Sequence, residues 1–380
     1  MSVRSSPRDL HGHQPSIDGL RGIAVLLVIG SHLVLLLGYQ QPTPWSAANR
    51  MLRGGFLGVD IFFVLSGFLI TSLILREVSE HGRFTLRAFY ARRALRLLPA
   101  LYVLLVVVFV VSIAVGFPLD AQWSVTWPAV LYIINWYYAL EAFGAAGEIF
   151  QTNLGHLWSL AIEEQFYLVW PFLMYVASRR RSLMRWMPVV SVLLVIAVIA
   201  QRVRLLDQGV GTVFIFVRTD ARLDSILLGT LLAFGYRHLD LHPRLCRFGA
   251  YVSLVVIAGF MNVAPTNSLL FRGGFTVIAI AAAFVILGSL DESWRPTAVL
   301  GSRVLTSTGR VSYGLYLWHF PIFDFMASHA TIETQSVRVV TALAVTGAVT
   351  VVSWRLIEAP CLRIKRRRFS GGAPAAGAIA

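Results

Sequence analysis

Long apolar stretches alternate along the chain with short polar segments that are rich in arginine. A helix that crosses the hydrocarbon core of a bilayer needs about 20 mostly apolar residues. Eleven stretches approach this length: 22–39, 55–75, 97–116, 127–143, 157–177, 186–200, 223–236, 248–263, 273–290, 311–328 and 337–354. The pattern predicts an all-α, polytopic membrane protein.

The distribution of lysine and arginine indicates how many of these stretches cross. Cytoplasmic loops carry an excess of both residues. If 127–143 does not cross, 25 of the 33 Lys and Arg residues lie on the side of the N-terminus, whereas 15 do so if it crosses. We therefore expect about ten transmembrane helices in the plasma membrane, with both termini cytoplasmic. The aromatic segment 127–143 is expected to lie at the outer interface or to re-enter the membrane.

Composition excludes several classes of protein. Hydrophobic residues make up 57% of the 380 residues and charged residues 14%, whereas soluble domains are about 45–50% apolar and about 25% charged. The net charge of +14 lies in short runs between apolar stretches, so cytoplasmic loops explain it better than nucleic-acid binding. Two cysteines without a CxxC motif indicate neither a disulfide framework nor a zinc site, and no metal is expected.

Three segments follow from this pattern. Residues 1–15 are expected to form a cytoplasmic N-terminal segment, 16–365 a membrane domain, and 366–380 a tail that is basic and then disordered. The chain contains no GxSxG, GxxxxGK[ST], GxGxxG or HExxH motif. A nucleophile elbow, a P-loop, a dinucleotide fold and a zincin site are therefore unsupported.

Ionisable residues within predicted spans are candidate functional groups, because each costs about 2.5–3.5 kcal/mol near a helix centre. His32 lies near mid-depth of the first span and is a candidate proton acceptor, with packing as the alternative. Asp60 is either a functional acid or one half of an ion pair. Glu163 is a candidate for orienting His32 or holding an acceptor. Glu164 lies about 100° further round the helix, so only one of the two glutamates is expected to point inward.

Arg93 and Arg96 end the densest arginine run of the chain. Their i, i+3 spacing places them on one helix face at the inner side of the membrane. Guanidinium groups arranged in this way suit a polyphosphate ligand, although topology alone explains most of the arginines here. Arg222, Tyr313 and His319 are weaker candidates for contact with a substrate, and a structural role explains each of them at least as well.

Six segments, taken in order, resemble the integral-membrane acyltransferase 3 family. They are IDGLRGIAVLLVIGSH, GGFLGVDIFFVLSGFLIT, FYARRALRLLPALY, HLWSLAIEEQFYLVWP, RLDSILLG and SYGLYLWHFPI, and the final WRLIEAP also resembles the family's usual end. The similarity covers about residues 15–365. It implies an enzyme that takes an acyl group, usually acetyl, from acyl-CoA and transfers it to a hydroxyl group of a cell-surface or exported carbohydrate.

The resemblance also implies roles for individual residues. The Arg-x10-His motif falls on Arg21 and His32, with His32 as the catalytic histidine. The RxxR motif falls on Arg93 and Arg96 and is implicated in binding the CoA donor, with Arg21 nearby. The conserved acid of the SLxxEEQFY segment falls on Glu163. The chain is expected to lack the extracytoplasmic esterase-like domain that some relatives carry.

These roles give a mechanism with a defined geometry. His32 takes the hydroxyl proton, and Glu163 or Asp60 fixes the tautomer of its imidazole. The RxxR pair is expected at the inner face, His32 near the middle, and Glu163 about 9 Å inside the outer face. An acyl-histidine intermediate remains open.

Two other functions also remain open. One is the same chemistry on a macrolide or another secreted small molecule. The other is secondary transport, because ten crossings with buried charges suit that class as well. No inverted repeat is visible, which argues against a transporter. The sequence determines neither the acceptor, the length of the acyl chain nor the oligomeric state.

Overall fold

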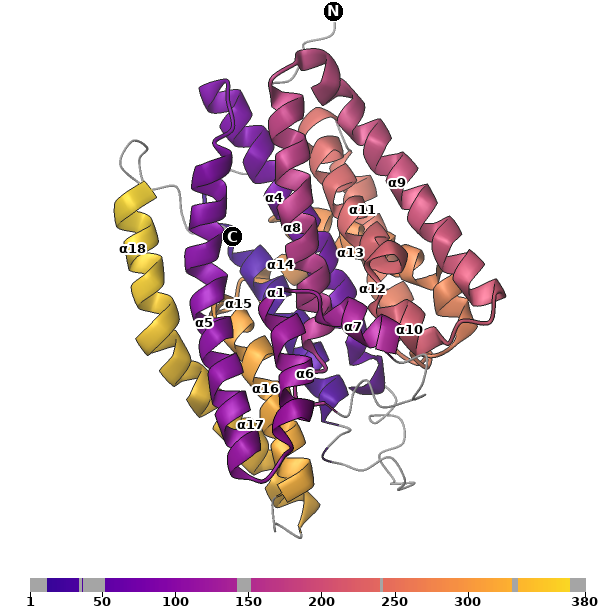
Figure 1. The fold of residues 1–380 in the computed structure, drawn as a ribbon. Coiled ribbons are helices and arrows are strands. Elements are labelled where there is room, and N and C mark those ends of the chain that lie inside the picture. The colour runs from indigo at the N-terminus through magenta and orange to yellow at the C-terminus, as the bar shows by residue number, and fades with distance from the viewer. Residues whose placement is uncertain are drawn as a thin grey trace, which may run out of the picture.

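A computed structural model describes residues 12–33, 36, 52–141, 152–239, 242–329 and 334–369. These residues form helices and no strand, which confirms the predicted all-α class (Figure 1). The longer helices are α1 (Pro15–His32), α4 (Gly58–His81), α5 (Leu86–Ala114), α8 (Leu157–Ser178), α9 (Arg181–Asp207), α11 (Thr219–His238), α12 (Pro243–Phe260), α13 (Phe275–Ser289), α16 (Ser312–His329) and α17 (Gln335–Ser353). Shorter elements are η1 (Gly54–Leu57), α6 (Leu119–Val130), α7 (Ile134–Glu141), α10 (Thr212–Val217), η3 (Leu270–Gly274), α14 (Pro296–Leu300), α15 (Arg303–Arg310), η4 (Trp354–Glu358) and α18 (Ala359–Phe369).

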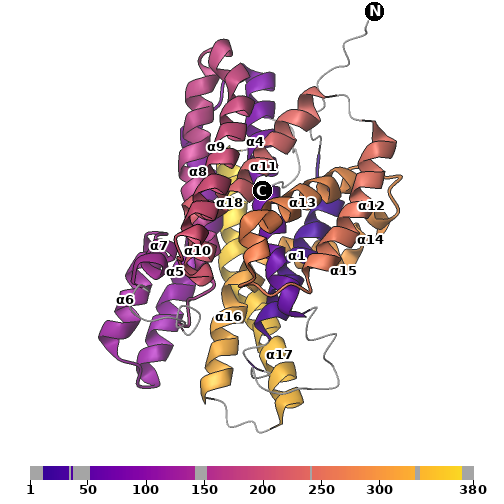
Figure 2. The same ribbon diagram turned by 90° about the vertical axis from the view of Figure 1, so that its right-hand side faces the viewer.

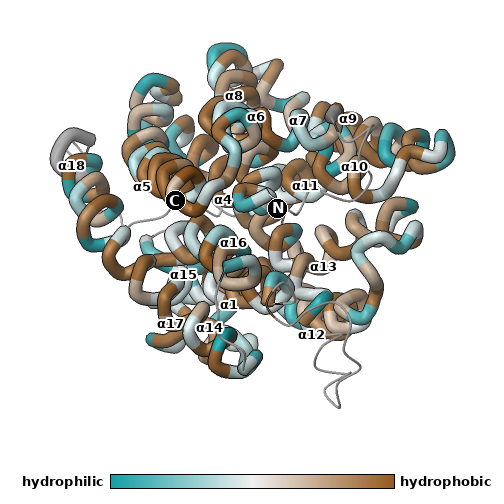
Figure 3. The backbone as a smooth tube through the Cα atoms, turned by 60° about the horizontal axis from the view of Figure 1, so that its bottom comes forward, coloured by the Kyte–Doolittle hydropathy of each residue, from teal (hydrophilic) through white to brown (hydrophobic). Residues whose placement is uncertain are grey.

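Several helices have the length and the surface of membrane spans. Six described segments are long and apolar enough to cross a bilayer: Gly54–His81, Leu86–Ala114, Ser182–Asp207, Pro243–Phe260, Leu270–Ser289 and Gln335–Lys365. Large apolar side chains on α5, α9, α12 and α17 point outward, and Figure 3 shows these helices largely in the hydrophobic colour. Such a surface suits contact with lipid tails. The chain is therefore a multi-pass membrane protein, while the count of ten crossings and the cytoplasmic termini remain predictions.

The aromatic segment 127–143 does not form one long helix. It is divided between α6 and α7, which have 12 and 8 residues. The break lies at Tyr132, whose φ is +54°, and a bulky residue adopts this region of backbone space only rarely. At 1.5 Å per residue neither helix reaches across a hydrocarbon core of about 30 Å. Residues 142–151 lie outside the described residues, as do residues 370–380 of the predicted tail 366–380.

Close helix packing at glycines fixes the centre of the bundle. A Cβ added at Gly67 of α4 would collide with the carbonyl oxygen of Ile226 on α11, and one added at Gly229 of α11 would collide with that of Val64 on α4. Small residues let two membrane helices approach backbone to backbone. Figure 2 shows α1 on the same side of the molecule as α13, α14 and α15, which it contacts, with α8 and α9 on the other side.

One helix begins earlier than its predicted span, and another begins at the predicted residue but inside the bundle. The first was expected from residue 22, but α1 begins at Pro15, and most of its first two turns are buried. The span expected from residue 157 does begin there, as α8, but its start is buried against neighbouring helices at Leu157 and Trp158. Counting residues from the start of α8 therefore does not measure depth below the outer face.

Candidate functional site

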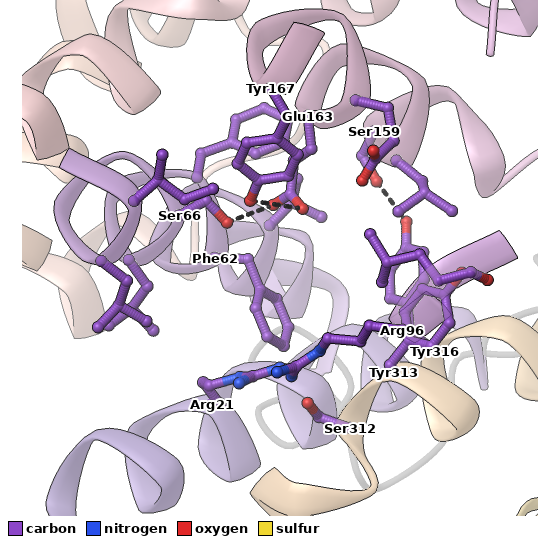
Figure 4. Close-up of a pocket in the computed structure, with 18 of the residues that line it drawn as sticks. Arg21, Phe62, Ser66, Arg96, Ser159, Glu163, Tyr167, Ser312, Tyr313 and Tyr316 are labelled. Carbon is purple, nitrogen blue, oxygen red and sulfur yellow. Dashed lines mark hydrogen bonds between the residues drawn. The ribbon is translucent and has the colours of Figure 1, made fainter. Parts of the chain in front are cut away.

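A cavity of about 100 Å³ lies between α1, α4, α5, α8 and α16. We call it the arginine pocket, because Arg21, Arg93 and Arg96 line it together with Glu163 and Glu164. Arg21, Arg93, Arg96 and Glu163 came from three separate candidate motifs, and the fold brings them to one place. Figure 4 shows the pocket, with Arg21 and Arg96 reaching toward one another from opposite sides below Phe62.

The three arginines differ in their partners. Arg93 donates a hydrogen bond of 3.1 Å to Glu164, and its guanidinium carbon lies 3.1 Å from the centroid of the Tyr167 ring. Neither Arg21 nor Arg96 makes a hydrogen bond or an ion pair with any side chain in the described part of the chain. Arg21 and Arg96 are therefore two cations in one small cavity that are not hydrogen-bonded to a carboxylate, and like charges so close repel each other. The guanidinium groups of Arg21 and Arg96 are suited to binding an anion, whereas Arg93 is already paired with Glu164.

The two glutamates both face the arginine pocket, which corrects the expectation that only one points inward. Glu163 accepts hydrogen bonds from the hydroxyl of Ser66 at 3.0 Å and from that of Tyr167 at 3.4 Å, whereas Glu164 pairs with Arg93. Glu163 thus shares a cavity with the RxxR arginines. The expected separation of these groups across the membrane is wrong, because the start of α8 is buried inside the bundle.

Three histidines form a cluster beside this pocket. His32 ends α1 and is half-buried, His319 lies on α16 and is buried, and His156 directly precedes α8 and is buried. The ring centroids of His32 and His319 are 5.1 Å apart, and those of His156 and His319 are 5.5 Å apart. His156 was not among the sequence candidates, because it lies just before a predicted span, where a residue is expected at the surface.

Hydrogen bonds fix the tautomers of two of these rings. The Nδ1 atom of His319 lies 3.0 Å from the carbonyl oxygen of Leu315, so this nitrogen carries the proton. In neutral His319 the Nε2 atom is then an acceptor. It lies 3.0 Å from Nδ1 of His32, which must donate. The Nε2 atom of His32 therefore keeps its lone pair, as a general base requires.

Tyr316 connects the histidine cluster with the arginine pocket. Its side chain lines the pocket, and its hydroxyl donates a hydrogen bond of 2.7 Å to the carbonyl oxygen of His156. The same hydroxyl contacts that of Ser159, and the ring centroid lies 5.6 Å from that of His319. His32 itself does not line the pocket. The side chain of Tyr316 thus contacts both the arginine pocket and the histidine cluster.

Asp60 and Arg222 pair with each other and make no hydrogen bond or ion pair with a histidine of the cluster in the described part of the chain. Their side chains are fully buried and 2.8 Å apart, and Asp60 also accepts a hydrogen bond of 3.0 Å from Ser225. The guanidinium of Arg222 lies 3.5 Å from the centroid of the Phe275 ring. Asp60 is thus engaged by Arg222 and Ser225 rather than by His32, and Arg222 does not line the arginine pocket. Opposite charges on adjacent buried helices pair because an unpaired buried charge is costly.

Tyr313 lines the arginine pocket, but its hydroxyl is engaged. It donates a hydrogen bond of 2.9 Å to the carbonyl oxygen of Leu97. No group of three or more His, Cys, Asp or Glu residues in the described ranges is arranged to hold a metal ion. The arrangement therefore offers an anion site at Arg21 and Arg96 and a base at His32.

Comparison with known proteins gives one family. The sequence profile of a family described as an acyltransferase domain matches residues 14–358. The O-acetyltransferase OatA of Staphylococcus aureus strain NCTC 8325 / PS 47 is 32% identical over 377 residues, which is 96% of this chain and 58% of OatA. A protein of strain MSSA476 that also carries an O-acetyltransferase name is 32% identical over 329 residues, which is 83% of this chain and 52% of that protein. The chain thus spans little more than half the length of these relatives. No solved structure matches it.

Proposed function

Because the chain belongs to the acyltransferase 3 family, we propose that it transfers an acyl group, in the first instance acetyl, from acyl-CoA to a hydroxyl group of a cell-surface or exported carbohydrate. The observation that carries this proposal is the arginine pocket beside the histidine cluster. The pocket supplies two cations without partners, and the cluster supplies an imidazole with a free lone pair. Donor binding and proton abstraction need these two features.

The donor site suits the phosphate groups of CoA. Guanidinium groups bind phosphate through paired N–H donors in a fixed fork. Arg21 and Arg96 have all of these donors available toward the pocket, because neither is engaged with a carboxylate. Arg93 acts on them indirectly, since its ion pair with Glu164 holds the wall of the pocket between α5 and α8. A cavity of about 100 Å³ admits part of the donor, so the side chains around it must move apart to admit the rest.

The chemistry is a direct transfer. The hydroxyl oxygen of the acceptor attacks the thioester carbonyl as Nε2 of His32 takes the hydroxyl proton. The new C–O ester bond forms, the C–S bond breaks, and the imidazolium of His32 returns the proton to the departing thiolate. His319 accepts the Nδ1–H of His32 throughout, which holds the ring in one orientation. General base catalysis of this kind contributes typically about 10²–10⁴-fold.

The proposal is tested with the purified protein in lipid nanodiscs. Release of free CoA from acetyl-CoA is measured with and without hydroxylated acceptors, for the wild type and for His32→Ala. We expect acceptor-dependent CoA release that His32→Ala abolishes while acetyl-CoA still binds. Transport of a solute without any CoA release, or full turnover by His32→Ala, would refute the assignment.

A further inference from the structure

A second and larger cavity lies at the end of the bundle away from the α4–α5 connection. It has a volume of about 710 Å³ and is lined by residues of α5, α6, α7, α16 and α17 and of the segment before α8. In Figure 1, α6, α16 and α17 lie in the lower part of the molecule beside the lower end of α5. Binding sites for small molecules typically measure about 300–1,000 Å³. We call it the apolar cavity, because most of its wall is aliphatic or aromatic, as at Val107, Val108, Val111, Ile322, Phe325 and Met326.

The wall of the apolar cavity carries polar groups that make no hydrogen bond or ion pair among the described residues, although His329 on the same wall interacts electrostatically with Asp324. Trp318 is buried, and its indole N–H makes no hydrogen bond. Asp324 is half-buried, also lines the cavity, and makes no hydrogen bond or ion pair. Six residues of helix separate the two along α16, which is about 9 Å. The indole N–H of Trp318 is thus available as a hydrogen-bond donor and the carboxylate of Asp324 as an acceptor, at two positions along an otherwise apolar wall.

Further polar groups line the cavity from α5, α6 and the segment before α8. Asn153 donates hydrogen bonds of 2.9 Å to Gln122 and 2.7 Å to Ser112, and all three line the cavity. These groups hydrogen-bond to one another, so no amide is left unpaired when the cavity holds no ligand. The same groups are available to a hydroxyl group of a ligand. Tyr138 and Thr152 add a second hydroxyl pair on the same side, 2.6 Å apart.

Two chain segments connect this cavity with the histidine cluster. Trp318 lines the cavity and is followed on α16 by His319. Thr152 and Asn153 line the cavity and are followed, three residues later, by His156. The arginine pocket reaches the same histidines through Tyr316. Residues of the cavity wall thus lie one and three positions before two of the cluster histidines in the chain, while the three histidines themselves line neither the arginine pocket nor the apolar cavity.

We propose that the apolar cavity binds the acyl acceptor, and that this acceptor is a largely apolar molecule carrying several hydroxyl groups. This proposal rests on the proposed function and names its substrate class. Each apolar Å² removed from water contributes about 25 cal/mol, so a valine-rich wall favours an apolar body. A bare oligosaccharide has hydroxyl groups on every face, and each one pressed against this wall without a partner would be costly. A hydroxylated ring system and a sugar on an aliphatic chain share the required chemistry.

Val111 and Val110 give a matched pair of variants for testing this site. Both lie on α5, but Val111 lines the cavity, whereas Val110 does not and is 59% exposed on the outer surface. A tryptophan at position 111 fills part of the cavity, and one at position 110 points toward lipid. Neither residue lines the arginine pocket, so acetyl-CoA binding reports independently that each variant is folded.

The experiment measures CoA release from acetyl-CoA in nanodiscs with three acceptors: decyl glucoside below its micelle concentration, a hydroxylated macrolactone, and a soluble oligosaccharide. We expect the wild type to use at least one of the first two with a KM at least tenfold lower than that for the oligosaccharide. Val111→Trp should raise the KM for the preferred apolar acceptor at least tenfold and leave the KM for acetyl-CoA unchanged. Val110→Trp should have the same KM values as the wild type. A lower KM for decyl glucoside would indicate a glycolipid acceptor, and a lower KM for the macrolactone would indicate a hydroxylated ring system.

Two results overturn the proposal: an unchanged acceptor KM in Val111→Trp, or an oligosaccharide used as well as the apolar acceptors. A different result would contradict the proposed function itself: the wild type would release no CoA with any acceptor. In that case equilibrium binding of radiolabelled decyl glucoside and macrolactone to the wild type and to Val111→Trp still decides whether the cavity holds such a ligand.

Discussion

The Nδ1 atom of His32 donates to the Nε2 atom of His319 across 3.0 Å. A hydrolase triad places a carboxylate at this position, where it fixes the tautomer and stabilises the imidazolium. Here a neutral histidine fixes the tautomer, and the backbone carbonyl of Leu315 fixes the histidine in turn. The relationship gives His319 a role that Glu163 and Asp60 were expected to play.

His319 is accordingly a positioning residue, and its replacement should lower kcat rather than raise the donor KM. We expect His319→Leu to lower kcat about 10²-fold or more, because His32 loses the acceptor of its Nδ1–H. His319→Gln keeps an acceptor oxygen near this place and should recover part of the rate. Steady-state CoA release measures both variants. Equal loss in the two, with equal loss of thermal stability, would indicate that His319 only supports the fold.

Arg96 should contribute to donor affinity through its unpaired guanidinium. A hydrogen bond to a charged group is worth about 1.5–3 kcal/mol, so Arg96→Ala should weaken acetyl-CoA binding about 10–100-fold. Arg92→Ala is the matched control, because Arg92 lies on the same helix, outside the pocket, and pairs with Glu77 at 3.3 Å. Titration calorimetry or filter binding measures the affinities. Equal affinities in the two variants would remove Arg96 from the donor site.

The buried pair of Asp60 and Arg222 should act on stability and not on the reaction. Breaking a buried pair by removing one partner costs about 3–5 kcal/mol, because the other charge is left uncompensated. We therefore expect Asp60→Leu to lower the thermal unfolding temperature strongly, and the double variant Asp60→Leu with Arg222→Met to recover much of this loss. The control is CoA release by the folded fraction of the double variant. Complete loss of that activity would point to a role for Asp60 in the reaction.

Gly67 should tolerate no side chain, because its backbone meets that of Ile226 on α11. Gly67→Ala forces α4 and α11 apart and should reduce the thermal stability of the protein. Gly347 on α17 is a suitable comparison, since a Cβ there meets nothing within 4 Å. Gly347→Ala should leave stability unchanged or raise it slightly, because alanine favours a helix. Identical unfolding temperatures for both variants would contradict the close packing of α4 and α11.

Hydropathy along the sequence was sufficient for the helical class and for most of the long apolar helices, because a bilayer demands uninterrupted apolar segments. It also indicated that 127–143 differs from its neighbours, and the structure divides this segment at Tyr132. The motifs singled out Arg21, Arg93 and Arg96, which the structure brings to one pocket. The sequence did not predict that Arg93 is the arginine with an ion-pair partner. That pairing depends on Glu164, whose direction is set by the packing of α8.

The sequence by itself determined which residues lie along apolar helices and about how far along each helix they are. Only the tertiary structure decided which residues face one another. His156 belongs to the histidine cluster because the chain just before α8 is buried. Asp60 pairs with Arg222 instead of a histidine because α11 places Arg222 beside it. The physical reason is that hydropathy and spacing give position along a helix, whereas charges and hydrogen bonds are satisfied between helices, by neighbours that may be distant in sequence.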